Sequence, residues 1–143
     1  MIKALSGLLA LSVALGVTPA LSQTKWDLHA AYAATNFHSE NLVQFANDVD
    51  KATGGKLKIS AFWGGSAGGD LPATQALRAG TQEMVCTSSS PLVGIVKELG
   101  AFDLPFLFAN EREADAVLDG PAGVYFNKKL EEAGLVNLAY WEN

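Results

Sequence analysis

The sequence predicts an α/β fold: a mostly parallel sheet flanked by helices. Segments that alternate between apolar and polar residues, as strands do, recur along the chain. Segments with the 3.6-residue period of amphipathic helices separate them, and glycine-containing turns divide the two kinds. The predicted order is β-α-β-α-β-α-α-α-β. Strands that alternate with helices form parallel sheets whose two faces are covered.

The first 22 residues predict a secretory signal peptide that is not part of the fold. A cationic start, Met1–Lys3, precedes the uncharged and mostly apolar run Ala4–Val17, and Ala20–Ser22 has the small-x-small form of a cleavage site. A membrane span needs roughly 20 apolar residues, which is more than this run offers. A buried N-terminal helix or an uncleaved anchor is the alternative. We expect a periplasmic protein whose mature chain, residues 23–143, forms one small domain without direct membrane insertion.

Three segments predict strands of a parallel sheet. Trp26–Ala33 and Lys56–Trp63 alternate apolar and polar residues, and Glu83–Thr87 has the form of a short buried strand. A last apolar segment, Leu135–Trp141, predicts a final strand. The apolar loop Leu104–Phe108 is expected to be buried against the sheet.

Capping residues and glycines mark the ends of five predicted helices. Leu42, Phe45, Ala46 and Val49 form the apolar face of the first helix. The five helices begin at Thr35–Asn36, Asp70, Ser88–Pro91, Asn110 and Asp119–Pro121, and the first, second, third and fifth end at Gly54–Gly55, Gly80, about Leu99 and Gly134.

The composition excludes several kinds of function. The net charge is −5 and the bases are scattered, whereas nucleic-acid binding needs clustered Lys and Arg. The two histidines and one cysteine show no metal-ligand spacing, so we predict neither a metal nor a cofactor. Cys86 is interpreted as a small core residue.

Polar residues follow the predicted strands at their carboxyl ends, where open α/β sheets bind ligands. Ser88, Ser89 and Ser90 follow the third strand, and their hydroxyl groups suit a polar ligand or cap a helix before Pro91. The turn Gly64–Gly69 could present backbone N–H groups to an anion or be a plain flexible turn. His38 could face the crevice or be a solvated residue at a helix start, and His29 is expected to be structural.

Several runs of residues occur in an order typical of one family. Together, the T-G-G-K-L, L-P-F-L-F and L-D-G-P-x-G runs are quite specific. The matching runs are Asn36–Asn41, Phe45–Ala46 with Val49, Thr53–Ile59, Leu77–Thr81, Phe102–Phe108, Leu118–Gly123, Gly134–Leu135 and Ala139–Asn143. From Lys25 to Asn143 the chain resembles the TRAP-transporter solute-binding proteins, also called the DctP family.

The resemblance implies the first lobe of a two-lobed periplasmic binding protein of the type II kind. Such a receptor captures a small organic acid and delivers it to membrane carrier subunits driven by an ion gradient. The cleft segments of this lobe would be Ala33–His38, Trp63–Ser66 and Ser88–Ser90. The candidate ligand-binding residues are Asn36, His38, Trp63, Ser66, Ser88, Ser89 and Ser90.

The chain departs from the family pattern in two places. Ser66-Ala67-Gly68 replaces the family's usual Gln/Ser-Leu-Gly. The family's arginine, which pairs with the ligand carboxylate, belongs to the second lobe and is matched by neither Arg78 nor Arg112. We therefore expect a chain that stops before its second lobe and binds organic acids weakly or not at all.

Two other functions stay open from the sequence. A small periplasmic serine hydrolase would use Ser88 or Ser89 with a histidine base, although no recognised catalytic spacing is present and we expect no enzyme. A sensing or non-functional fragment of the same fold is the other alternative.

Overall fold

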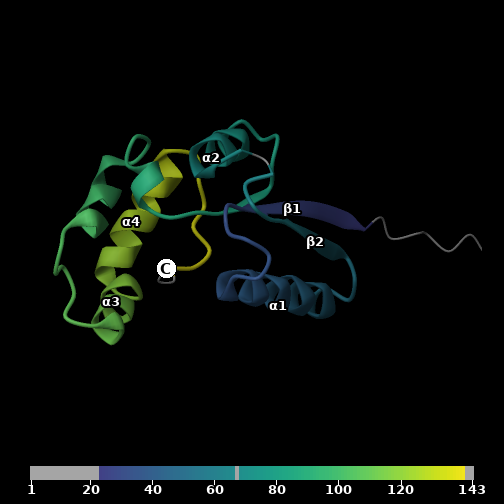
Figure 1. Ribbon diagram of the computed structural model, residues 1–143, viewed down its shortest axis with the longest axis horizontal. Coiled ribbons are helices and arrows are strands. Elements are labelled where there is room, and N and C mark those ends of the chain that lie inside the picture. Colours follow the sequence, from purple (N-terminus) through teal and green to yellow (C-terminus); the bar gives the residue numbers. More distant parts are fainter. Residues whose placement is uncertain (1–22, 67, 141–143) are drawn as a thin grey trace, which may run out of the picture.

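A computed structural model describes residues 23–66 and 68–140. The predicted signal peptide (residues 1–22), Ala67 and the end of the chain (residues 141–143) lie outside the described residues. The sheet has three parallel strands in the order β2-β1-β3 (Figure 1). The strands are β1 (Thr24–Ala30), β2 (Leu57–Phe62) and β3 (Met84–Cys86), each shorter than its predicted segment.

The strand order places helices on both faces of the sheet. α1 (Phe37–Ala52) connects β1 to β2, and α2 (Asp70–Arg78) connects β2 to β3 on the other side of β1. Because crossovers between parallel strands are right-handed, connections that run in opposite directions along the sheet lie on opposite faces. Figure 1 shows α1 on one side of the sheet and α2 on the other. The predicted fold class is confirmed.

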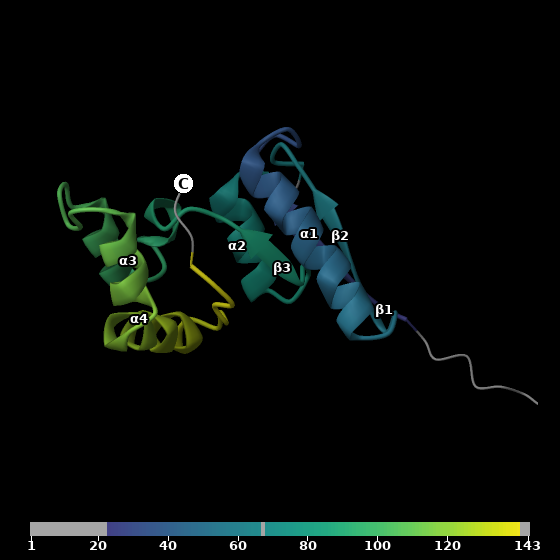
Figure 2. The ribbon, with the colours of Figure 1, turned by 90° about the horizontal axis from the view of Figure 1, so that it is seen from below.

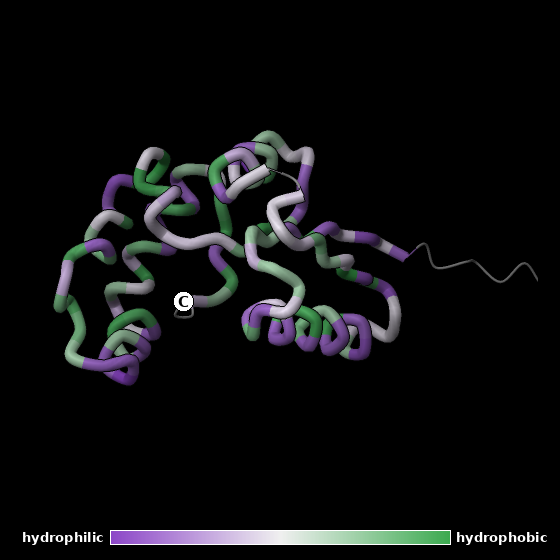
Figure 3. The backbone as a smooth tube through the Cα atoms, viewed as in Figure 1, coloured by the Kyte–Doolittle hydropathy of each residue, from purple (hydrophilic) through white to green (hydrophobic). Residues whose placement is uncertain are grey.

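The first core cluster lies between α1 and the sheet. It consists of Leu28, Ala30, Leu42, Ile59 and Met84. Leu28 and Ala30 are only 2% and 3% exposed, because β1 is the central strand. Hydrophobic and hydrophilic residues are interspersed along α1 (Figure 3), and its Leu42, Ala46 and Val49 pack in this core. Phe45, predicted on the same face, is instead 38% exposed.

The helix ends confirm two predictions and correct one. The side chain of Asn36 accepts a hydrogen bond from the N–H of His38, so it caps α1 as predicted. Gly54 and Gly55 follow α1 with φ values of 61° and 79°, which suit glycine. The prediction that Asp70 caps the second helix is wrong. Gly69 is the N-cap residue, and Asp70 is the first residue of the helix. A carboxylate in the first turn still stabilises a helix through its dipole.

The second half of the chain builds a second core cluster. Its elements are the 3₁₀ helices η1 (Ser90–Leu92) and η2 (Lys97–Asp103), then α3 (Glu111–Leu118) and α4 (Pro121–Glu132). Leu92, Val96, Leu99, Phe126, Leu130 and Leu135 are buried together. The predicted helix that ends near Leu99 is instead two 3₁₀ turns, since Gly94 and the β-branched residues around it disfavour a continuous helix.

The predicted final strand is wrong for residues 135–140, which form no strand. The segment turns back from the end of α4 (Figure 2), and α4 holds it by side-chain hydrogen bonds. The Oδ1 atom of Asn127 accepts from Asn137 Nδ2 at 3.1 Å and from the Tyr140 hydroxyl at 2.7 Å. Burial raises the pKa of the Tyr140 phenol.

The apolar loop is not buried as predicted. Leu104 is 58% exposed, and Phe106 is 100% exposed with a left-handed φ of 59°. Within the described residues, this loop has no part of the sheet to pack against, because η2 and α3 carry it away from the strands (Figure 1). No helix among the described residues is long and apolar enough to cross a membrane.

Candidate functional site

The parallel register brings three loops to one edge of the sheet. His29 lies opposite Phe62 on β2 and opposite Val85 on β3, so the three strands end side by side. The loops that follow are residues 31–36, residues 63–66 with 68–69, and residues 87–89. We call them the carboxyl-edge segments. This is the place where open α/β sheets bind ligands.

Backbone hydrogen bonds join the first two carboxyl-edge segments. Gly64 N–H donates to the carbonyl of Tyr32 at 2.8 Å, and Gly65 N–H donates to that of Ala30 at 3.3 Å. Gly64 and Gly65 have φ values of 65° and 68°, which only glycine adopts without strain. The start of the glycine-rich turn is therefore tied by its backbone to the segment at the end of β1.

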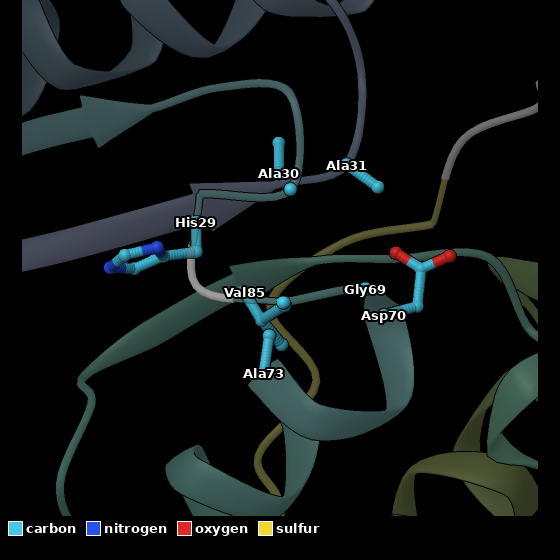
Figure 4. A pocket seen from close by; sticks show the side chains of 9 residues that line it. His29, Ala30, Ala31, Gly69, Asp70, Ala73 and Val85 are labelled. Atoms are coloured by element: carbon cyan, nitrogen blue, oxygen red, sulfur yellow. The ribbon is translucent and has the colours of Figure 1, made fainter.

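A small hollow of about 10 Å³ lies at this edge, which is room for about one water molecule (Figure 4). It is lined by His29, Ala30, Ala31, Gly65, Gly68, Gly69, Asp70, Ala73 and Val85. A larger open hollow lies beside Asn110, Glu111 and Arg112 at the start of α3. We place the candidate site at the carboxyl edge because three strand ends converge there, whereas the α3 hollow has one short segment as its wall.

Four N–H groups in the described part of the glycine-rich turn donate to carbonyl oxygens of the protein. The N–H groups of Gly64 and Gly65 are already donated, as described above. Ser66 N–H donates to the carbonyl of Trp63 at 3.3 Å, and Gly68 N–H to that of Gly65 at 2.8 Å. These four donors are used within the protein and are not available to an anion.

His38 is buried, so its interpretation as a solvated residue is wrong. It is 3% exposed, and its ring centroid lies 5.0 Å from that of Tyr32 and 3.8 Å from that of Phe37. His29 stacks on Phe62 with centroids 4.8 Å apart. This contact agrees with the structural role predicted for His29, although its Nδ1 atom is buried without a hydrogen-bond partner in the described structure.

The other candidate residues differ in their placement. Ser88 and Ser89 are half-buried at the end of β3, and Trp63 is half-buried against the first core cluster. Ser66 is exposed. Ser90 is also exposed, and its hydroxyl donates to the carboxylate of Asp103, so its side chain serves the η1–η2 connection.

Sequence reasoning missed two residues of this region. Tyr32 packs against His38 from the loop after β1. Asp70 adds a carboxylate to the hollow at the start of α2 (Figure 4). Their position directly after a strand and directly after the glycine-rich turn is the signal that could have found them. No group of acidic, histidine or cysteine residues in the described parts of the chain could hold a metal ion.

Comparisons with known proteins agree with this architecture. Residues 29–143 match the model of "Bacterial extracellular solute-binding protein, family 7", abbreviated DctP. A solute-binding protein from Verminephrobacter eiseniae is 34% identical over 124 residues, which cover 87% of this chain and 37% of the relative. The chain therefore spans well under half the length of this relative.

Solved structures of similar proteins also match most of this chain but well under half of their own length. A sugar acid binding protein from Advenella mimigardefordensis, in complex with galactonate, has a TM-score of 0.82 and 37% identity over 85% of this chain and 39% of that one. A TRAP periplasmic solute-binding protein from Ochrobactrum anthropi has a TM-score of 0.81 and 35% identity over 85% and 38%. The described residues form one lobe of this two-lobed architecture. The chain belongs to family 7 of the bacterial extracellular solute-binding proteins, the DctP family.

Proposed function

We propose that the chain supplies one lobe of a periplasmic binding protein that captures a small organic acid for a TRAP-type transporter. The observation that carries this proposal is the convergence of the three carboxyl-edge segments in a chain of the DctP family. The named relatives and solved structures of this family are binding proteins. The hydrolase alternative receives no support from the comparisons.

The ligands named for similar proteins suggest the class of ligand. Relatives include a C4-dicarboxylate-binding protein from Bacillus subtilis and a 2,3-diketo-L-gulonate-binding periplasmic protein from Escherichia coli. All such ligands carry a carboxylate. A membrane carrier is the expected partner, and export by the predicted signal peptide would place the protein in the periplasm with it.

In this proposal the ligand-contacting residues are Asn36, Trp63, Ser66, Ser88 and Ser89. His38 does not contact the ligand in this proposal; its buried ring packs against Tyr32 in the first carboxyl-edge segment. We leave Ser90 out, since its hydroxyl is engaged by Asp103.

A chimeric receptor tests the proposal. Residues 23–143 would replace the matching part of the Advenella galactonate receptor, which supplies the rest of the cleft. Calorimetry with a panel of organic acids should show binding of at least one of them, with the unaltered Advenella receptor as the control. A folded chimera that binds none of the acids, while the control binds galactonate, would contradict the proposed function.

A further inference from the structure

The loop between η2 and α3 exposes several large apolar side chains close together. Leu104 and Phe106 are exposed as described above, and Leu107 is 40% exposed. The loop and α3 lie at the end of the molecule away from the sheet (Figures 1 and 2). Apolar side chains that gather on a surface mark contacts with another protein, whereas single ones need no explanation. The loop therefore has the character of a contact surface.

Hydrogen bonds on both sides of Phe106 hold this loop in place. Before it, the carboxylate of Asp103 accepts from the hydroxyl of Ser90. After it, the N–H of Ala109 donates to the carboxylate of Glu113 at 2.9 Å. Phe106 itself keeps a left-handed φ, which costs energy in a residue with a Cβ atom. A ring that is already held in solvent loses little conformational freedom on contact, so it suits the role of an anchor.

The open hollow at the start of α3 lies directly beyond this loop. It has a volume of about 470 Å³ and is lined by Asn110, Glu111 and Arg112. Asn110 follows Phe106 closely in the chain, and even an extended chain spans that separation in at most about 14 Å. A cavity of about 150 Å³ holds a benzene ring, so the hollow has room for a phenylalanine side chain. The chain's own Phe106 does not occupy it, because that ring is fully exposed. We call residues 104–112 the loop–helix face.

Two side chains of opposite charge border the hollow. Glu111 and Arg112 are both exposed, and within the described parts of the chain neither side chain makes a hydrogen bond or an ion pair. Adjacent residues do not face each other on a helix, so these two do not pair with each other. The Arg112 guanidinium can also lie over an aromatic ring that enters the hollow. A partner that offers a carboxylate, a guanidinium and an aromatic ring would match this face.

A second copy of this chain offers the same three groups. In a symmetric dimer the same surface patch lies on both sides, so every contact between two different residues is made twice. We propose that the loop–helix face pairs two copies of the chain. Phe106 of each copy enters the hollow of the other, and Glu111 of each copy pairs with Arg112 of the other. The face is small, and interfaces that bury less than about 1,200 Å² belong to weak, transient complexes. The face shares no residue with the carboxyl-edge segments, so this inference does not depend on the proposed function.

Sedimentation velocity of the purified chain tests this pairing. The sedimentation coefficient should rise from the monomer value toward the dimer value as the concentration increases into the high micromolar range. Phe106→Asn should raise the dimer Kd at least about tenfold, because it removes the anchor. Asparagine tolerates the left-handed φ, so the loop keeps its backbone. Val136→Asn is the matched control and should leave the Kd unchanged, since Val136 is 74% exposed in the segment after α4, outside the loop–helix face.

A charge exchange tests the reciprocal ion pairs. Arg112→Glu alone should raise the dimer Kd at least about tenfold, because it sets carboxylates of the two copies against each other. The double variant Glu111→Arg/Arg112→Glu should return the Kd toward that of the unaltered chain, since each charge again meets its opposite. The double variant keeps a carboxylate in the first turn of α3, which stabilises the start of the helix. Circular dichroism of each variant would show that it folds.

Backbone amide NMR signals of the isotope-labelled chain locate the contact. Dilution should shift the signals of the loop–helix face, and shifts confined to other segments would overturn the inference. A chain that stays monomeric at every concentration overturns it, and so does a dimer that Phe106→Asn does not weaken. If the chain is monomeric and Phe106→Asn lowers the Tm of the chimeric receptor, the loop packs on the rest of the receptor instead, which also overturns the pairing. Each of these outcomes leaves the proposed function to be decided by ligand binding to the chimera.

Discussion

Replacing Gly123 by alanine should destabilise the chain, because the junction of α3 and α4 has no room for a Cβ atom. A Cβ built on Gly123 would lie 1.7 Å from the carbonyl oxygen of Leu118 and 2.7 Å from its carbon. Both neighbours are backbone atoms, so no side-chain rotation relieves the overlap. The junction must open by more than about 1 Å before an ordinary contact is restored.

The magnitude follows from two opposing effects. Overpacking of a tight site costs about 1–3 kcal/mol, and a backbone overlap belongs at the upper end. Alanine in a helix regains up to about 1 kcal/mol relative to glycine. We expect a net loss of about 2 kcal/mol in the free energy of unfolding, which lowers Tm by about 8 °C in a domain of this size.

Urea unfolding followed by circular dichroism measures this loss. Gly94→Ala is the control, because a Cβ at Gly94 meets no atom within 4 Å and its φ is not left-handed. The control should stay within about 0.5 kcal/mol of the unaltered chain. A Gly123→Ala variant as stable as this control would refute the close approach of α3 and α4.

Three further predictions concern single side chains. Asn36→Ala should cost about 1 kcal/mol in urea unfolding, since it removes the cap of α1, whereas Asn36→Asp should retain most of that stability; equal losses in both variants would contradict the capping role. Asn127→Ala should lower the raised pKa of the Tyr140 phenol toward its ordinary value of 10.0 in an ultraviolet titration, because burial raises this pKa and the smaller side chain exposes the phenol to water. Because the folded pKa of Tyr140 is raised, its contribution to stability is complete below about pH 10 and is lost as the pH rises through the folded value; an unfolding free energy that rises in this range would contradict it. Phe106→Asn should leave the unfolding free energy unchanged or raise it by up to about 1 kcal/mol, since the ring is fully exposed and asparagine tolerates the left-handed φ; a clear loss would show that the ring is buried in solution.

The first three strands and two helices could be predicted from the sequence because their signals are local. The alternation of Trp26–Ala33 and the cap at Asn36 each describe a segment and its immediate neighbours. The strand predicted from the apolar run Leu135–Trp141 was wrong for residues 135–140, because an apolar segment becomes a strand only when another strand pairs with it. Leu104–Phe108 failed for a similar reason, since burial needs a surface to pack against.

The location of the candidate site could be predicted from the sequence, whereas the roles of its individual side chains could not. The rule that ligands bind at the carboxyl ends of parallel strands located the three loops without any coordinates. The roles of single residues depend on tertiary contacts that spacing does not encode. His38 is buried by Tyr32, and Ser90 is engaged by Asp103 from η2, thirteen residues away along the chain.

The central claim is that β1 lies between β2 and β3 and runs parallel to both, which brings the three loops to one edge of the sheet. Nuclear Overhauser contacts between backbone protons test it directly in the labelled chain. Leu28 should show contacts to both Ala61 on β2 and Met84 on β3. Contacts between β2 and β3, together with their absence between Leu28 and Met84, would contradict the strand order and with it the proposed site.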